Sequence, residues 1–93
     1  MPGTAKATIF VDNDRVRVTG YRFQPGQNTG WHRHDHDYVV VPLMDGRLRL
    51  ETADGSSLAE MRQGVPYFRE QGVEHDVINA TEGEYAFIEI ELK

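Results

Sequence analysis

The chain has 93 residues, a formal net charge of −5 and no cysteine. This length suits one domain, so we expect residues 1–93 to fold as a single domain. The lack of cysteine excludes disulfides and thiolate metal sites. The acidic balance, without a basic cluster, argues against nucleic acid and anionic membranes as partners. No apolar segment approaches the ~20 residues of a membrane span, and the N-terminus has no apolar signal core, so we expect a cytoplasmic protein.

Turn-forming residues divide the chain into short segments that are rich in β-branched and aromatic residues. Pairs such as Asp45-Gly46 and Asp54-Gly55 are typical turn signals, and they recur about every ten residues, as in all-β sandwiches and barrels. The predicted strands cover residues 7–11, 15–23, 38–43, 47–51, 57–62 and 85–92. The sequence therefore predicts an all-β protein of antiparallel strands whose edges are covered in a barrel or double sheet.

Two of these segments alternate between apolar and charged residues. In residues 47–51, Leu48 and Leu50 share one face and the charged residues share the other. In residues 86–92, the aliphatic side chains Ile88, Ile90 and Leu92 share a face. Alternation of this kind indicates a strand with one buried and one solvated face, and we expect the aliphatic faces to be buried.

The four histidines suggest a metal site. His32, His34 and His36 fall within five residues, and His75 lies about forty residues later. A His-x-His pair on a strand directs both rings to one face, about 7 Å apart along the backbone, from where they can converge on one ion. His75 can supply a third ligand from a neighbouring strand. A pair of exposed histidines on a polar strand would explain the His-x-His pattern equally well.

The surroundings of these histidines resemble the paired motifs of the cupin superfamily. The resemblance covers residues 26–79 and implies a jelly-roll barrel with one divalent metal ion at its mouth (Fe, Zn, Ni, Mn or Cu). It also implies that Asn79 has a structural role in a turn. The first motif comprises Gly26, His32, His34 and Gly46; the second comprises Gly64, Glu70, Gly72, His75 and Asn79. The implied metal ligands are His32, His34 and His75.

The chain departs from the cupin pattern at the usual fourth ligand, which is a glutamate three or four residues after the second histidine. Tyr38 and Val39 occupy these positions. We therefore expect a site of three neutral histidines that leaves the full charge of a divalent ion uncompensated. Tyr38 shares the parity of the ligands and is our candidate catalytic residue, with a purely structural core role as the alternative. We expect His36 to be exposed.

The resemblance implies a small polar metabolite as substrate or ligand. Cupins that lack the glutamate include dioxygenases with iron on three histidines, which favours a non-haem metal-dependent oxygenase. The alternatives are a metal-dependent ligand-binding or sensor module without turnover, and a structural metal or none. The segment around residues 30–43 also resembles small cupins linked with β-alanine degradation.

A homodimer is expected for two reasons. Tyr85 and Phe87 share a face with Glu89 and Glu91, and aromatic side chains on an otherwise wet face suggest a contact between subunits. Cupins also commonly form homodimers, which would support so small a core.

Overall fold

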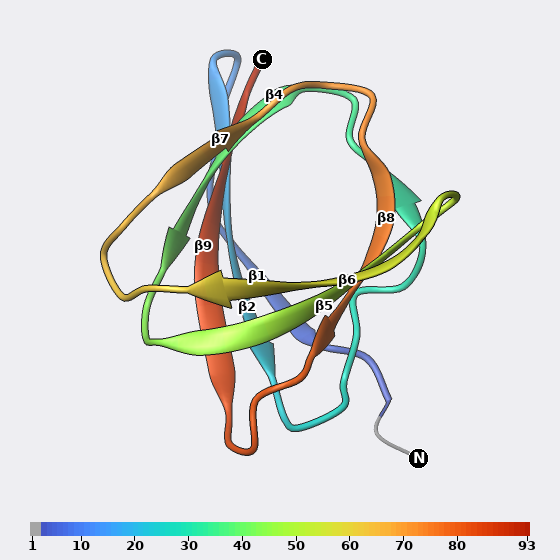
Figure 1. Ribbon diagram of the computed structural model, residues 1–93. Helices are drawn as coiled ribbons and strands as arrows, with labels where there is room; N and C mark the ends of the chain where they lie inside the picture. Colours follow the sequence, from blue (N-terminus) through green and yellow to red (C-terminus); the bar gives the residue numbers. More distant parts are fainter. Residues whose placement is uncertain (1–2) are drawn as a thin grey trace.

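The computed structural model describes residues 3–93, and all of its regular elements are strands (Figure 1). The strands are β1 (Lys6–Asp12), β2 (Val16–Phe23), β3 (His32–Arg33), β4 (Asp37–Pro42), β5 (Gly46–Thr52), β6 (Gly55–Met61), β7 (Tyr67–Arg69), β8 (Glu74–Asn79) and β9 (Tyr85–Leu92). Among the residues described, no helix is long and apolar enough to cross a membrane.

The strands form two sheets that curve around a common interior, as Figure 1 shows. One sheet has the order β1-β2-β9-β4-β7, and the other has the order β3-β8-β5-β6. Each pairing between these strands is antiparallel. This arrangement confirms the predicted all-β jelly-roll barrel, in which each sheet buries its inner face against the other.

Three strands lie outside the segments predicted from turn residues and alternation, although the histidine spacing had placed His32 and His75 on neighbouring strands, as the structure does. β3 and β7 contain two and three residues, which is too short for an alternating pattern to be recognised. β8 begins with the polar residues Glu74, His75 and Asp76, and its apolar part is only two residues long. These strands are set by pairing with distant neighbours rather than by local composition.

The core confirms the predicted faces of β5 but reverses those of β9. Leu48 is 1% exposed, as its alternation predicts, whereas the expected burial of the β9 aliphatic face was wrong. Tyr85 and Phe87 are buried, and Phe87 packs against Phe23 with ring centroids 5.6 Å apart. The aromatic residues occupy the interior because they bury more apolar area per residue than the isoleucines on the other face. The aliphatic residues of β9 therefore point out of the barrel.

Asn79 has the structural role that the resemblance implies. Its side chain is 2% exposed, and its Nδ2 donates to the carbonyls of Phe23 at 3.2 Å and Gly83 at 2.9 Å. Its Oδ1 accepts a hydrogen bond from Thr81 N at 2.8 Å. Asn79 thus ties the end of β8 to the end of β2 and to the turn before β9.

Gly46 is required by packing against a core aromatic residue. A Cβ at this position would lie 2.4 Å from Cδ1 of Tyr85, whose side chain is fully buried. We expect Gly46→Ala to lower the free energy of unfolding by about 1–3 kcal/mol, because the Tyr85 ring cannot move away without disturbing the core. Urea unfolding followed by fluorescence measures this change.

Gly83→Ala is the matched control, because a Cβ there would meet no atom of the described chain within 4 Å. It should change the stability by less than about 0.5 kcal/mol. Equal stability of the Gly46→Ala variant and the unaltered chain would contradict the packing argument.

Candidate metal centre

Strand pairing brings the histidines of the two motifs together. His32 on β3 lies directly opposite His75 on β8 in the antiparallel register. His34 follows the end of β3, where its N donates to the Val73 carbonyl at 2.9 Å and its carbonyl accepts from Gly72 N at 2.7 Å. These two backbone hydrogen bonds fix His34 beside the start of β8. The structure thus brings together all three predicted ligands.

The three imidazoles converge through the same ring nitrogen. Nε2 of His34 lies 2.9 Å from Nε2 of His32 and 3.1 Å from Nε2 of His75. One ligand atom from each of the three residues lies within 4.8 Å of the others. His34 and His75 are buried, with exposed fractions of 7% and 9%, and His32 is half-buried.

The opposite ring nitrogens of His32 and His34 face acceptors. Nδ1 of His32 lies 2.8 Å from the Gly30 carbonyl oxygen, which can accept a hydrogen bond but cannot donate one. Nδ1 of His34 faces Oε1 of Glu89 at 3.7 Å. In neutral rings with the proton on Nδ1, the Nε2 lone pairs point at one another, which is unfavourable unless a cation lies between them. Acceptors behind the rings are also typical of metal-binding histidines.

The residues fit a single bound ion. Two nitrogens that each lie about 2.1 Å from one metal ion, at right angles, are about 3 Å apart. The separations of 2.9 and 3.1 Å between the Nε2 atoms match this value. Imidazole is a suitable ligand for zinc, copper, iron and nickel, so the donor set does not select one of them.

Asp76 holds the loop that orients His32. Its Oδ1 accepts from Gly30 N at 3.0 Å, and its Oδ2 accepts from Asn28 Nδ2 at 2.9 Å. Gly30 has a φ of 86°, in the left-handed region that favours glycine. The loop therefore presents the Gly30 carbonyl to His32 in one fixed orientation.

Burial keeps two of the three histidines neutral. Desolvation, followed by the charge of neighbouring histidines, lowers the pKa of His34 and of His75 to about 4. At neutral pH both rings are therefore unprotonated and can bind a metal without first losing a proton.

Glu89 is a site residue that the sequence reasoning missed. It was expected on a solvated face, but its side chain is 5% exposed and faces the histidines from β9. Desolvation, followed by the nearby Glu91 charge, raises the pKa of Glu89 to about 7. Its place on the same face as Tyr85 and Phe87 was the available signal, because an aromatic face is the one to be buried. The centre therefore has a carboxyl group nearby, although not at the position where most cupins carry it.

Tyr38 and His36 occupy different places around the cluster. The Tyr38 ring is 2% exposed and stacks on His34 with ring centroids 3.9 Å apart. Burial raises the pKa of the Tyr38 hydroxyl, which thus remains a hydrogen-bond donor. His36 is half-buried at the barrel mouth rather than exposed, and it lies outside the converging cluster. A catalytic role for Tyr38 stays a prediction.

The cluster lies between two hollows of different character. On the interior side is a cavity of about 180 Å³. Its walls are mainly apolar, and Tyr38, Arg69 and Glu89 provide polar groups. On the mouth side, a more open hollow of about 410 Å³ is lined by charged residues that include Arg17, Arg33 and Glu91. A small molecule in either hollow would lie next to the histidines.

A barrel of two antiparallel sheets with three converging imidazoles at its mouth defines a small jelly-roll protein with a site suited to one metal ion. Residues 21–91 match the cupin domain family. The chain belongs to the cupin family.

Individual relatives agree with this assignment. The beta-alanine degradation protein BauB of Pseudomonas aeruginosa is 56% identical over 89 residues, which cover 96% of this chain and 94% of BauB. A crystal structure of a cupin domain from Bordetella pertussis Tohama I has a TM-score of 0.97 and 52% identity, and the match covers 100% of this chain and 97% of that one. A double-stranded β-helix domain from Klebsiella pneumoniae shares the fold, with a TM-score of 0.79 at 16% identity over 96% of this chain and 76% of that one.

The buried histidines should make the stability of the metal-free protein depend on pH. Between about pH 6.5 and 4 the unfolded histidines bind protons that folded His34 and His75 do not, so the free energy of unfolding should fall on acidification. Glu89 opposes this trend, because its folded pKa of about 7 exceeds the ordinary 4.5. Glu89→Gln should therefore lose stability more steeply than the unaltered chain.

Urea unfolding with a chelator present, between pH 7 and pH 4.5, measures how the free energy of unfolding changes with pH in the unaltered chain and in Glu89→Gln. A flat profile in Glu89→Gln would contradict the assigned pKa shifts.

Proposed function

We propose that this chain is a metal-dependent cupin in which His32, His34 and His75 hold one divalent ion through Nε2. The observation that carries the proposal is the convergence of these three nitrogens at 2.9 and 3.1 Å. Two of the rings also have Nδ1 directed to the acceptors Gly30 and Glu89. The arrangement is already formed in the folded chain, so binding would need little reorganisation.

We further propose that the protein is an enzyme of non-haem oxygenase type with iron as its ion. A bound iron would supply Lewis acidity and the activation of dioxygen. The chain itself would exclude water through the apolar cavity wall and position the bound molecule through Tyr38 and Arg69. Glu89 lines the cavity beside His34, and its carboxyl group would accept or donate a proton there.

The substrate that best suits the cavity is a small carboxylate. A volume of about 180 Å³ is below the roughly 300–1,000 Å³ of pockets for drug-sized ligands. Arg69 lines this cavity, and its guanidinium, which lies over the Tyr67 ring, is the cation there that can pair with a carboxylate. The relative BauB is named for beta-alanine degradation and matches along almost its whole length. We therefore place this chain in the breakdown of β-alanine or a related three-carbon acid.

Replacing one ligand tests the metal centre. His75→Ala should abolish stoichiometric metal in protein purified without a histidine tag, because two imidazoles hold a divalent ion much more weakly than three. Metal analysis by plasma mass spectrometry gives the ratio of ion to chain. His36→Ala is the matched control, since His36 is at the mouth but outside the cluster, and it should keep one ion per chain. Full retention of metal in His75→Ala would refute the ligand assignment.

Oxygen uptake tests the proposed reaction class. Protein loaded anaerobically with Fe(II) should consume dioxygen with β-alanine or another three-carbon amino or oxo acid, and His75→Ala should not. Tyr38→Phe should keep its metal but lower kcat by roughly tenfold, the effect of losing one hydrogen bond to the bound molecule.

Tyr85→Phe is the control for the loss of a hydroxyl, because the buried Tyr85 hydroxyl has no hydrogen-bond partner among residues 3–93 and lies outside the cavity wall. Its kcat should be unchanged. If no acid supports oxygen uptake while one raises the melting temperature of the metal-loaded protein, the chain is instead a ligand-binding module without turnover.

A further inference from the structure

The inner face of the five-stranded sheet brings two groups of opposite charge to one cavity. In the antiparallel register, Tyr67 on β7 is opposite Val40 on β4, and Val40 is opposite Glu89 on β9. Arg69 follows two residues after Tyr67 on the same strand, so both residues point to the same face. Tyr67, Arg69 and Glu89 all line the interior cavity of about 180 Å³. A guanidinium and a carboxyl group therefore approach this cavity from two strands that are separated by β4 alone.

The same inner face holds the two aromatic residues of β9 on which a contact between subunits was expected. Tyr85 and Phe87 are 0% and 4% exposed. Because they are buried in the core they cannot contact another chain, and the homodimer stays a prediction without a defined surface.

Within residues 3–93, Glu89 has no cationic partner. Its side chain is 5% exposed, and the basic group that it faces is Nδ1 of His34 at 3.7 Å. An imidazole that binds a metal ion through Nε2 is neutral, so His34 cannot balance the charge of a carboxylate. Burying an ionised carboxyl group without a partner is costly. A cation on a bound molecule would offset this cost and favour the ionised form of Glu89.

Arg69 likewise forms no ion pair among the residues described. Its Nη1 donates to the Phe68 carbonyl at 2.9 Å, and its Cζ lies 4.5 Å from the centroid of the Tyr67 ring. These contacts hold the guanidinium in place and leave N–H groups for a carboxylate, to which the planar fork is suited. Arg17, which shares this face, differs in having two carboxylate partners.

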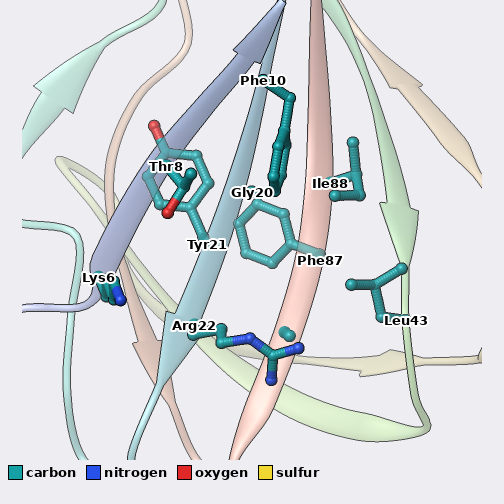
Figure 2. Close-up of a pocket in the computed structure, with 10 residues that line it drawn as sticks. Lys6, Thr8, Phe10, Gly20, Tyr21, Arg22, Leu43, Phe87 and Ile88 are labelled. Atoms are coloured by element: carbon teal, nitrogen blue, oxygen red, sulfur yellow. The ribbon is translucent and has the colours of Figure 1, made fainter.

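The outer face of the same sheet does not combine the two kinds of group. Its hollow of about 130 Å³ is lined by the cations Lys6 and Arg22 and, in the part of the chain that the structure describes, by no acidic side chain (Figure 2). Arg22 is also paired with Glu84 already. A small acid in this hollow would gain nothing from an additional positive charge, so selection for such a charge belongs to the interior cavity.

From the two unpaired groups we infer that the interior cavity recognises a short zwitterion, whose carboxylate binds Arg69 and whose ammonium group binds Glu89. The inference rests on the proposed function and narrows its substrate to an amino acid. It makes Glu89 the residue that distinguishes an amino acid from other small acids.

The spacing of the two groups favours a β-amino acid. Two strand spacings separate Tyr67, which holds the guanidinium, from Glu89, which is roughly 10 Å. Side chains stand roughly perpendicular to a sheet, so the charged ends keep a similar separation. Hydrogen bonds of about 2.9 Å at each end leave roughly 4 Å for the ligand. Two carbon atoms between the ammonium and carboxylate groups span this distance, whereas the single carbon of an α-amino acid is too short.

Titration calorimetry on the zinc-loaded full chain tests the inference, because zinc has no redox chemistry and the ligand is not consumed. At pH 8, β-alanine should bind at least tenfold more tightly than propanoate, which has the same carbon chain without the ammonium group. α-Alanine, whose ammonium group is one carbon closer to the carboxylate, should also bind at least tenfold more weakly than β-alanine. Equal affinities for β-alanine and propanoate would overturn the inference.

Two variants separate the roles of the charged groups. Glu89→Gln should keep its zinc and bind β-alanine and propanoate equally, because the charge is lost while the shape is kept. Arg69→Met should weaken both ligands at least tenfold and by similar factors. Arg22→Met is the matched control for the loss of an arginine, since Arg22 lines the outer hollow, and both affinities should be unchanged. A preference for β-alanine that survives in Glu89→Gln would contradict the assignment.

Failure of this inference can be distinguished from failure of the proposed function. If the unaltered chain holds no zinc, the metal centre is wrong and the inference falls with it. If one zinc ion is held per chain and β-alanine binds no better than propanoate, or does not bind, the selection of an amino acid is wrong and the metal centre stands.

Discussion

The centre depends on the antiparallel pairing of β3 with β8. β3 is only two residues long, yet its register places His32 directly opposite His75. The backbone hydrogen bonds of His34 to the segment before β8 then bring the third ring to the same point. Asp76, next to His75, fixes the loop that holds the ring of His32 from behind. Residues 72–76 therefore contain one histidine of the cluster, orient a second and anchor the third.

The two sheets contribute different chemistry to the centre. The nitrogen donors come from β3, the residues that follow it and β8, which belong to the four-stranded sheet. Tyr38 and Glu89 approach from β4 and β9 of the five-stranded sheet. The site is complete only because the barrel closes. The Glu89 carboxyl group next to the rings is tolerated there because burial raises its pKa to about 7, so that it is neutral below that pH.

Much of the fold and the three histidines could be predicted from the sequence, because turn residues, alternation and motif spacing are local features. The orientation of β9 was predicted wrongly, because its aliphatic face is uniformly apolar whereas the other face combines Tyr85 and Phe87 with two glutamates, and packing against Phe23 places the aromatic face inside. Glu89 was misplaced for the same reason. The fixed Nδ1 contacts of His32 and His34 arise from residues that are distant in sequence or in a loop, and no local pattern encodes them.

The side chains on both faces of strand β9 have a structural role, so substitutions on either face are constrained. Its inward residues fill the core and reach the histidines, while its outward residues, Ile88 and Ile90, belong to the apolar surface of the same sheet. Glu89 lies between Ile88 and Ile90 in the sequence, so each of its chain neighbours belongs to that outer surface. Any redesign of the cavity is therefore better begun from β5, whose outward residues Arg47 and Arg49 are exposed to solvent, than from β9. In this small barrel, the segment with the most to contribute is also the one with the least freedom to change.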